Sequence, residues 1–149
     1  MRRVLVDADA CPVKEEVYRV ALRHNVATVI VSNQRIRIPD HPLITRAVVN
    51  DVFDAADDWI AETAGTKDVV VTGDILLADR CLKLGAEVLA HTGRPFTTSS
   101  IGAAIATRAI MADLRAGVGA TGGPAPFGKA DRSRFLSALD GALVRLGRG

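Results

Sequence analysis

Short runs of apolar, mostly β-branched residues recur along the first two thirds of the chain, separated by polar or glycine-containing segments. Runs of this length and composition are typical of strands that are buried on both faces of a sheet. The clearest is Val69-Val70-Val71, inside a predicted strand over residues 68–72. Further strands are predicted over residues 4–6, 26–31, 47–49 and 87–89, the last of these being the final strand that the pattern indicates.

Between these runs the apolar residues recur at helical spacing. Val13, Val17 and Val20 follow Pro12 on one face, and they predict a helix over residues 12–24. Residues 32–42 form a polar, proline-containing loop. Four more helices are predicted: residues 54–64, residues 75–84 closed by Gly85, residues 100–116 capped by Ser99 or Ser100, and residues 129–146.

Strands that alternate with helices predict a mostly parallel sheet covered on both sides. The 149 residues fit one α/β domain with one core, so the chain is interpreted as a single domain over residues 1–149. Its residues 91–149 form a helical C-terminal part of that domain. In sheets of this kind, ligands bind beyond the carboxyl ends of the strands.

Composition narrows the function classes. Aromatic residues make up only 4% of the chain, which argues against a nucleic-acid platform built on stacked bases. No apolar run approaches the roughly 20 residues that span a bilayer, and the start of the chain lacks a secretory leader pattern. Cys11 and Cys81 are the only cysteines and are too far apart in sequence for a zinc motif, so both are interpreted as reduced thiols of a cytoplasmic protein with no membrane partner.

The net charge of +2 hides an asymmetry along the chain. Residues 1–90 carry 11 Lys and Arg against 14 Asp and Glu, a balance of −3, whereas residues 91–149 carry 8 against 3, a balance of +5. An acidic part beside a basic part suits a metal site next to a phosphate-binding surface. Charges that simply decorate solvated faces are the alternative explanation, and they account for most of these residues.

Aspartates stand at the predicted strand ends. Asp7 and Asp9 follow the first strand directly, and residues two apart in extended chain point the same way. Asp74 follows the strand of residues 68–72, while Asp54, Asp57 and Asp58 open a helix. Carboxylates gathered at one edge repel each other unless a cation lies between them, and hard oxygen ligands suit Mg²⁺ or Mn²⁺.

Each candidate has a purely structural alternative. An aspartate that opens a helix often serves only as a cap or as a partner of the helix dipole, which applies to Asp54 and Asp58 and is weaker for the pair Asp7 and Asp9. Asp79 is interpreted as solvated, and Cys11 as a packed thiol. The three histidines, His24, His41 and His91, are isolated in sequence and are assigned no chemistry.

Four ordered blocks carry a resemblance to a known family: Asp7-Ala8-Asp9-Ala10-Cys11-Pro12-Val13-Lys14, Phe53-Asp54-Ala55-Ala56-Asp57, Thr72-Gly73-Asp74-Ile75-Leu76-Leu77-Ala78 and Thr121-Gly122-Gly123-Pro124. Together with Asn33 they resemble the YaiI/YqxD family of uncharacterised bacterial proteins, over nearly the whole chain. That family is similar to the PIN-like nucleases. The resemblance implies a three-layer α/β/α sandwich around a central, mostly parallel sheet, followed by C-terminal helices.

In PIN-like nucleases, acids at the strand ends hold Mg²⁺ or Mn²⁺ for phosphodiester cleavage. Carried over by motif, the resemblance implies catalytic and metal-binding roles for Asp7 and Asp74, followed by Asp9 and Asp57. The sequence departs from the family in the long helix, where Arg108-Ala109 stands in place of an Arg-Asp pair. The predicted site of Asp7, Asp9, Asp57 and Asp74 does not require the aspartate that is missing from this helix.

The leading hypothesis is therefore a metal-dependent nuclease, with RNA as its expected substrate. Lys14 and Arg108 are candidate phosphate contacts, and Asn33 is a candidate site-lining group; a solvated helix charge is an equal alternative for Lys14. Two other hypotheses stay open: an aspartyl-nucleophile phosphohydrolase of the haloacid-dehalogenase type, and a non-catalytic metal- or nucleic-acid-binding module. The sequence also leaves open whether the chain forms a homo-oligomer, and whether Thr121-Gly122-Gly123-Pro124 is more than a turn.

Overall fold

A computed structural model of the chain describes residues 2–9, 11–50, 55–118 and 127–147, with the side chains of residues 111–118 left aside. Asp54 and the Thr121-Gly122-Gly123-Pro124 motif lie outside the described residues. The described helices include none that is long and apolar enough to cross a membrane.

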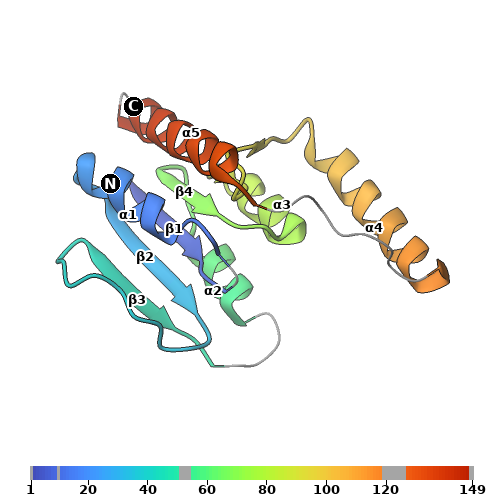
Figure 1. The fold of residues 1–149 in the computed structure, drawn as a ribbon, viewed down its shortest axis with the longest axis horizontal. Helices are drawn as coiled ribbons and strands as arrows, with labels where there is room; N and C mark the ends of the chain where they lie inside the picture. The colour runs from blue at the N-terminus through green and yellow to red at the C-terminus, as the bar shows by residue number, and fades with distance from the viewer. Residues whose placement is uncertain (1, 10, 51–54, 119–126, 148–149) are drawn as a thin grey trace.

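The centre of the molecule is a sheet of six strands in the order β3-β2-β1-β4-β5-β6 (Figure 1). The first five strands are parallel, and β6 runs antiparallel to β5. Runs of β-branched residues form these strands because such side chains pack well on a pleated surface. The strands are β1 Arg3–Asp7, β2 Ala27–Ser32, β3 Ile44–Val48, β4 Asp68–Val71, β5 Glu87–Leu89 and β6 Pro95–Phe96.

Helices cover both faces of this sheet, so the predicted three-layer α/β/α arrangement is confirmed. Successive side chains of a strand point to opposite faces, and Val4 and Val6 accordingly pack into one core while Leu5 packs into the other. Helices α1 (Lys14–Arg23) and α5 (Lys129–Gly147) cover the first face. Helices α2 (Ala55–Thr63) and α3 (Ile75–Lys83) cover the second.

The last two helices contribute differently to the hydrophobic core. Helix α5 buries Phe135, Leu139 and Leu143 completely against the sheet and α1. Helix α4 (Ile101–Val118) projects away from the sheet in Figure 1, and only its first turn, at Ile101, is buried among its described side chains. Because α4 contributes little to the core, its residues remain available for other contacts.

The sequence pattern missed strand β6. Residues 87–89 are not the final strand, because the chain reverses through Gly93 and Pro95–Phe96 pairs with β5. Gly93 has a φ of +86°, and a Cβ there would come within 2.6 Å of the Arg134 backbone, so this turn requires glycine. A two-residue edge strand that begins with proline carries no periodic signal.

Ser100, one of the two predicted caps, directly precedes α4, and its carbonyl accepts from the Ala104 N–H at 3.2 Å. Its side chain acts together with Thr97. The Thr97 Oγ1 accepts from the Ser100 backbone N–H at 3.1 Å, and the Ser100 Oγ accepts from the Thr97 N–H at 3.1 Å. This reciprocal pair satisfies two donors at the start of the helix, as in a capping box. The predicted closing role of Gly85 after α3 is confirmed by its φ of +85°.

Candidate functional site

A pocket of about 430 Å³ lies at the carboxyl ends of the central strands. Strand β1 delivers Asp7 and Asp9 to it, and the turn after β4 delivers Gly73 and Asp74. These segments meet because β1 and β4 are parallel neighbours, with Val6 opposite Val71. Three of the four aspartates predicted from the sequence therefore line one pocket. Among the residues that the structure describes, the lining consists of Asp7, Asp9, Gly73, Asp74, Ile75, His91 and Arg108.

A buried hydroxyl holds the first of these carboxylates. The Thr72 Oγ1 donates to the Asp7 Oδ2 at 2.9 Å, and the same oxygen accepts from the Asp74 backbone N–H at 3.0 Å. Since the backbone occupies the acceptor side of the hydroxyl, its one proton is directed at the carboxylate. Thr72 is fully buried, so this orientation is fixed by the fold.

The second carboxylate is held in the same way from the neighbouring strand. The Ser32 Oγ donates to the Asp9 Oδ1 at 2.9 Å and accepts from the Gln34 backbone N–H at 3.0 Å. Ser32 ends β2 as Thr72 follows β4, and both are buried. Sequence reasoning missed these two hydroxyl residues, although each stands at the end of a predicted strand where a polar side chain is unexpected in a buried position.

The environment of Asp7 disfavours its charge. Burial raises the pKa of Asp7, and the nearby Asp9 and Asp74 carboxylates raise it further, against the lowering effect of the Thr72 hydrogen bond. Burial contributes most to this shift in pKa, and the negative groups that share the site add to it. A cation bound in this pocket would reverse it, because positive charge favours the ionised carboxylate.

Asp74 caps helix α3. Its Oδ1 accepts from the backbone N–H groups of Leu76 at 2.9 Å and Leu77 at 3.2 Å. Both bonds use the same carboxylate oxygen while the residue also lines the pocket. Capping therefore orients Asp74 without excluding a second role. Asp58, by contrast, forms a surface ion pair with Arg80 at 2.9 Å and does not line the pocket.

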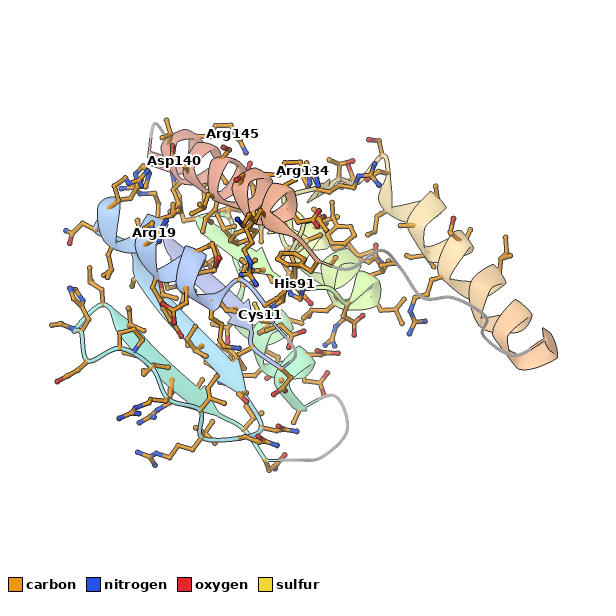
Figure 2. All side chains as sticks on the ribbon, viewed as in Figure 1. Cys11, Arg19, His91, Arg134, Asp140 and Arg145 are labelled. Atoms are coloured by element: carbon orange, nitrogen blue, oxygen red, sulfur yellow. The ribbon has the colours of Figure 1, made fainter. Side chains whose placement is uncertain are left out.

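His91 also lines the pocket, although it was assigned no chemistry from the sequence. It follows the end of β5 by two residues, and it lies toward the middle of the molecule in Figure 2. Its Nε2 is buried and has no hydrogen-bond partner among the described residues. Burial lowers the pKa of His91, and the Lys14 charge lowers it further. The rule that located Asp7 and Asp9, a position just beyond a predicted strand, could have found His91 as well.

The side chain of His91 rests against a glycine. A Cβ built at Gly73 would lie 3.3 Å from the His91 Cε1 and 3.6 Å from its Nδ1. The glycine therefore lets the imidazole edge approach the turn that carries Asp74.

The three residues predicted to contact substrate are placed differently. Arg108 lines the pocket from the exposed part of α4. Lys14 opens α1 beside the pocket; its Nζ donates to the Cys11 carbonyl at 3.0 Å, and its charge reaches His91. Asn33 is exposed directly after Ser32 and is not among the pocket-lining residues. The structure thus brings Arg108 to the acids and leaves Asn33 at the rim of the same sheet edge.

Asp57 lies on α2 and is not among the residues that line this pocket. Its charge instead contributes to raising the pKa of Cys81, a shift to about 11 that is caused mainly by burial. Cys11 is buried as well, and burial raises the pKa of its thiol, which agrees with the prediction of a packed thiol. Both cysteines are free.

Comparison with known proteins assigns the chain to a family. The profile described as the uncharacterised YaiI/YqxD family matches residues 5–145. The chain belongs to the YaiI/YqxD family. It is 71% identical to a UPF0178 protein of Sphingopyxis alaskensis over 98% of this chain and 96% of the relative. It is 58% identical to a UPF0178 protein of Nitrobacter winogradskyi over 98% and 93% of the two chains. No solved structure matches it.

The site of this YaiI/YqxD protein fits a hydrated divalent cation. Within the described residues, no three His, Cys, Asp or Glu side chains form a ready-made ligand cluster for one ion. Mg²⁺, however, commonly keeps several waters and takes only one or two protein carboxylates together with substrate phosphates. Asp7 and Asp9, each oriented by one hydroxyl, supply oxygen donors of that kind.

Proposed function

We propose that this protein is a metal-dependent nuclease that cleaves phosphodiester bonds, with RNA as its substrate and Mg²⁺ or Mn²⁺ as its cofactor. One observation carries the proposal: Asp7, Asp9 and Asp74 line a single pocket beside Arg108, and no described cationic side chain pairs with any of the three acids. Uncompensated carboxylates next to a guanidinium suit a metal ion that holds a phosphate between them.

The bound metal would activate water and neutralise charge that builds on the phosphoryl oxygens. The chain's own residues supply the frame. Asp7 and Asp9, oriented by Thr72 and Ser32, would hold the ion, and Asp74 at the start of α3 would be a further ligand. Arg108 binds the phosphate, and Lys14 and Asn33 extend the contact along the sheet edge. Asp57 is the fourth candidate ligand, although it is not among the described residues that line the pocket.

The proposal includes a place among the PIN-like nucleases. A three-layer sandwich with acids at the carboxyl ends of parallel strands supports it. RNA is proposed as the substrate on the same resemblance. We place the activity in the cytoplasm, because the free Cys11 and Cys81 suit a reducing compartment.

A cleavage assay tests the proposal. Labelled RNA and DNA are incubated with the protein and Mn²⁺, with EDTA as the metal-free control. We expect metal-dependent cleavage of RNA and a loss on the order of 100-fold in Asp7→Asn, since the ion would lose a charged ligand. Asp40→Asn makes the same chemical change in an exposed loop outside the pocket and should leave the rate unchanged. Equal rates in the two variants would contradict the assignment.

An aspartyl-nucleophile phosphohydrolase is the second candidate. It is favoured by Asp7 and Asp9 standing two residues apart after a buried strand, each accepting a hydroxyl hydrogen bond. In that reaction Asp7 would attack phosphorus and Asp9 would serve as acid and base. A fluoroberyllate bonded to Asp7 in a crystal soaked with beryllium fluoride would favour it over the nuclease. Nucleic-acid binding without turnover would instead favour a non-catalytic module.

A further inference from the structure

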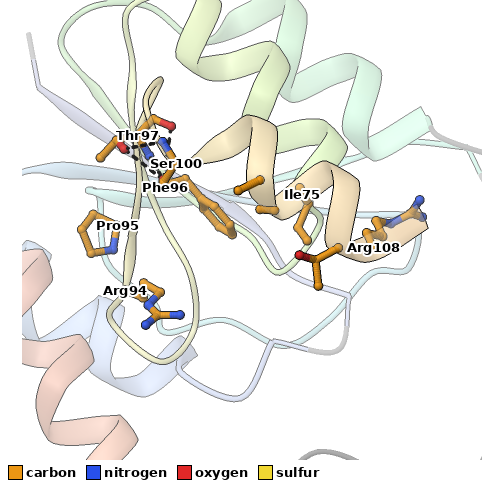
Figure 3. A pocket seen from close by; sticks show the side chains of 10 residues that line it. Ile75, Arg94, Pro95, Phe96, Thr97, Ser100 and Arg108 are labelled. Carbon is orange, nitrogen blue, oxygen red and sulfur yellow. Dashed lines mark hydrogen bonds between the residues drawn. The ribbon is translucent and has the colours of Figure 1, made fainter. Parts of the chain in front are cut away.

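A larger cavity adjoins the acidic pocket. It encloses about 1050 Å³ between β6, the first residue of α3 and the N-terminal half of α4. Figure 3 shows Phe96 and Ile75 at its wall, with Arg94 and Arg108 toward different ends. The volume is at the upper end of the range for small-molecule sites in proteins. Ala103, Ala104 and Thr107 complete the side formed by α4.

The cavity and the acidic pocket are adjacent, since Ile75 and Arg108 line both of them. A group bound in the cavity would therefore lie next to a group bound beside Asp7 and Asp74. Under the proposed function, the second group is a phosphate of a nucleic-acid strand, so the first is the next part of the same strand.

The lining of the cavity matches a nucleobase. Phe96 and Ile75 give flat or apolar contact, and the side of α4 presents the small residues Ala103 and Ala104. The Thr97 and Ser100 hydroxyls bond each other at 2.9 Å and cap α4, so they are engaged within the protein. The exposed guanidinium groups of Arg94 and Arg108 are positioned for phosphates. Apolar walls with a cationic rim are typical of sites that stack a base without reading its edge.

We propose that this cavity holds an unpaired nucleobase of the strand whose phosphate occupies the acidic pocket. The inference rests on the proposed function for the phosphate and adds a second subsite to it. A base can enter only after leaving its helical stack, so the cavity favours single strands over duplexes. Because stacking is insensitive to base identity, it gives little sequence preference.

Binding of two fluorescein-labelled strands tests the subsite without cleavage. One is a uridylate of about ten nucleotides, and the other has the same ribose-phosphate backbone without bases. Fluorescence anisotropy is measured in EDTA with the whole chain. Both strands carry the same phosphates, so repulsion from the acids affects them alike and the difference reports the base. We expect the strand with bases to bind roughly tenfold more tightly, as one stacked base provides.

Two matched variants of α4 locate the effect. Ala103→Phe fills the cavity, whereas Ala109→Phe places the same side chain on an exposed position of the same helix that does not line it. We expect Ala103→Phe to abolish the difference between the strands and Ala109→Phe to retain it. Circular dichroism of both variants checks that α4 remains folded.

The outcomes separate the subsite from the nuclease. Equal binding of the two strands by the parent, no binding of either strand, or equal behaviour of Ala103→Phe and Ala109→Phe would overturn the subsite, even if RNA is cleaved. A difference that only Ala103→Phe removes would support the subsite even if no cleavage is found.

Discussion

Carboxylates at the two ends of the central strands lie in opposite environments. At the amino end of β4, Asp68 is 2% exposed and accepts from two guanidinium nitrogens of Arg3, Nε at 3.0 Å and Nη2 at 2.9 Å. At the carboxyl end of β1, Asp7 receives one hydroxyl hydrogen bond from Thr72 and shares its pocket with Asp9 and Asp74. The first arrangement neutralises its charge internally, while the second leaves its charge to be neutralised from outside.

This difference separates folding from function within one sheet. A buried carboxylate that serves the fold is paired and saturated with donors, because an unpaired buried charge is costly. Acids that serve a ligand must remain incompletely compensated, since a protein cation in the site would exclude a metal ion. Neutralising Asp68 and neutralising Asp7 should therefore change stability in opposite directions.

The largest effect is expected from Asp68→Asn. The change removes the ion pair with Arg3 and weakens the acceptor of the Gly65 N–H, which Asp68 Oδ2 binds at 2.8 Å. We expect the free energy of unfolding to fall by on the order of 2–3 kcal/mol. This is at the low end for a buried ion pair, because Arg3 keeps contact with water. Urea unfolding followed by circular dichroism measures it. An unchanged unfolding midpoint would show that the ion pair of Asp68 with Arg3 does not stabilise the fold, which would contradict this comparison of the two ends.

The hydroxyl that orients Asp7 gives the next largest effect. Thr72→Val keeps the shape of a fully buried side chain but removes the donor to Asp7 and the acceptor of the Asp74 N–H. The expected cost is about 1–2 kcal/mol, because a buried N–H loses its partner. Thr72→Ser retains the hydroxyl and is the control, expected to lose less. Equal losses in the two variants would assign the effect to packing instead of the hydrogen bonds.

Asp74 combines both kinds of role, so two substitutions separate them. Asp74→Ala removes the cap of α3 and should cost about 1 kcal/mol in metal-free protein, whereas asparagine still caps. Asp74→Asn should leave the metal-free protein as stable as the parent or slightly more stable. Both variants should lose part of the stabilisation that Mg²⁺ or Mn²⁺ gives, because an ion that binds only the folded state raises stability by mass action. Thermal unfolding with and without metal is the measurement, and a parent unaffected by either ion would contradict the metal site.

The smallest effect is a stabilisation at the acidic pocket. The pKa of Asp7 is raised in the folded protein, so its contribution to stability is fully present at low pH and is lost as pH rises through that pKa. Asp7→Asn, which cannot ionise, should therefore be more stable than the parent at pH 7 in EDTA, by on the order of 1 kcal/mol or less. The gain should shrink as the buffer falls toward pH 4. Unfolding midpoints measured over this pH range test the prediction, with Asp40→Asn as the matched control. A stability gain that grows as the pH falls would mean that the pKa of Asp7 is lowered in the folded protein.

Local pattern was enough to determine most of the elements and three acids of the site. The apolar runs around Leu5 and Val70 predict strands because a buried strand needs continuous β-branched or aliphatic residues, whatever surrounds it. Parallel strands then put Asp7, Asp9 and Asp74 at one edge, as the structure has them. These inferences succeed because each depends on sequence neighbours and on a geometry common to all parallel sheets.

Only the tertiary structure decided which other groups join them. The order β3-β2-β1-β4-β5-β6 places β5 beside β4, which brings His91 to the pocket, whereas Asp57 on α2 is not among its described lining residues. Neither strand order nor the rotation of a helix about its axis is written in a local pattern. The same holds for Thr72, whose proton is directed at a carboxylate 65 positions earlier in the chain. Such contacts depend on packing between distant segments, and the periodicity within one segment cannot predict them.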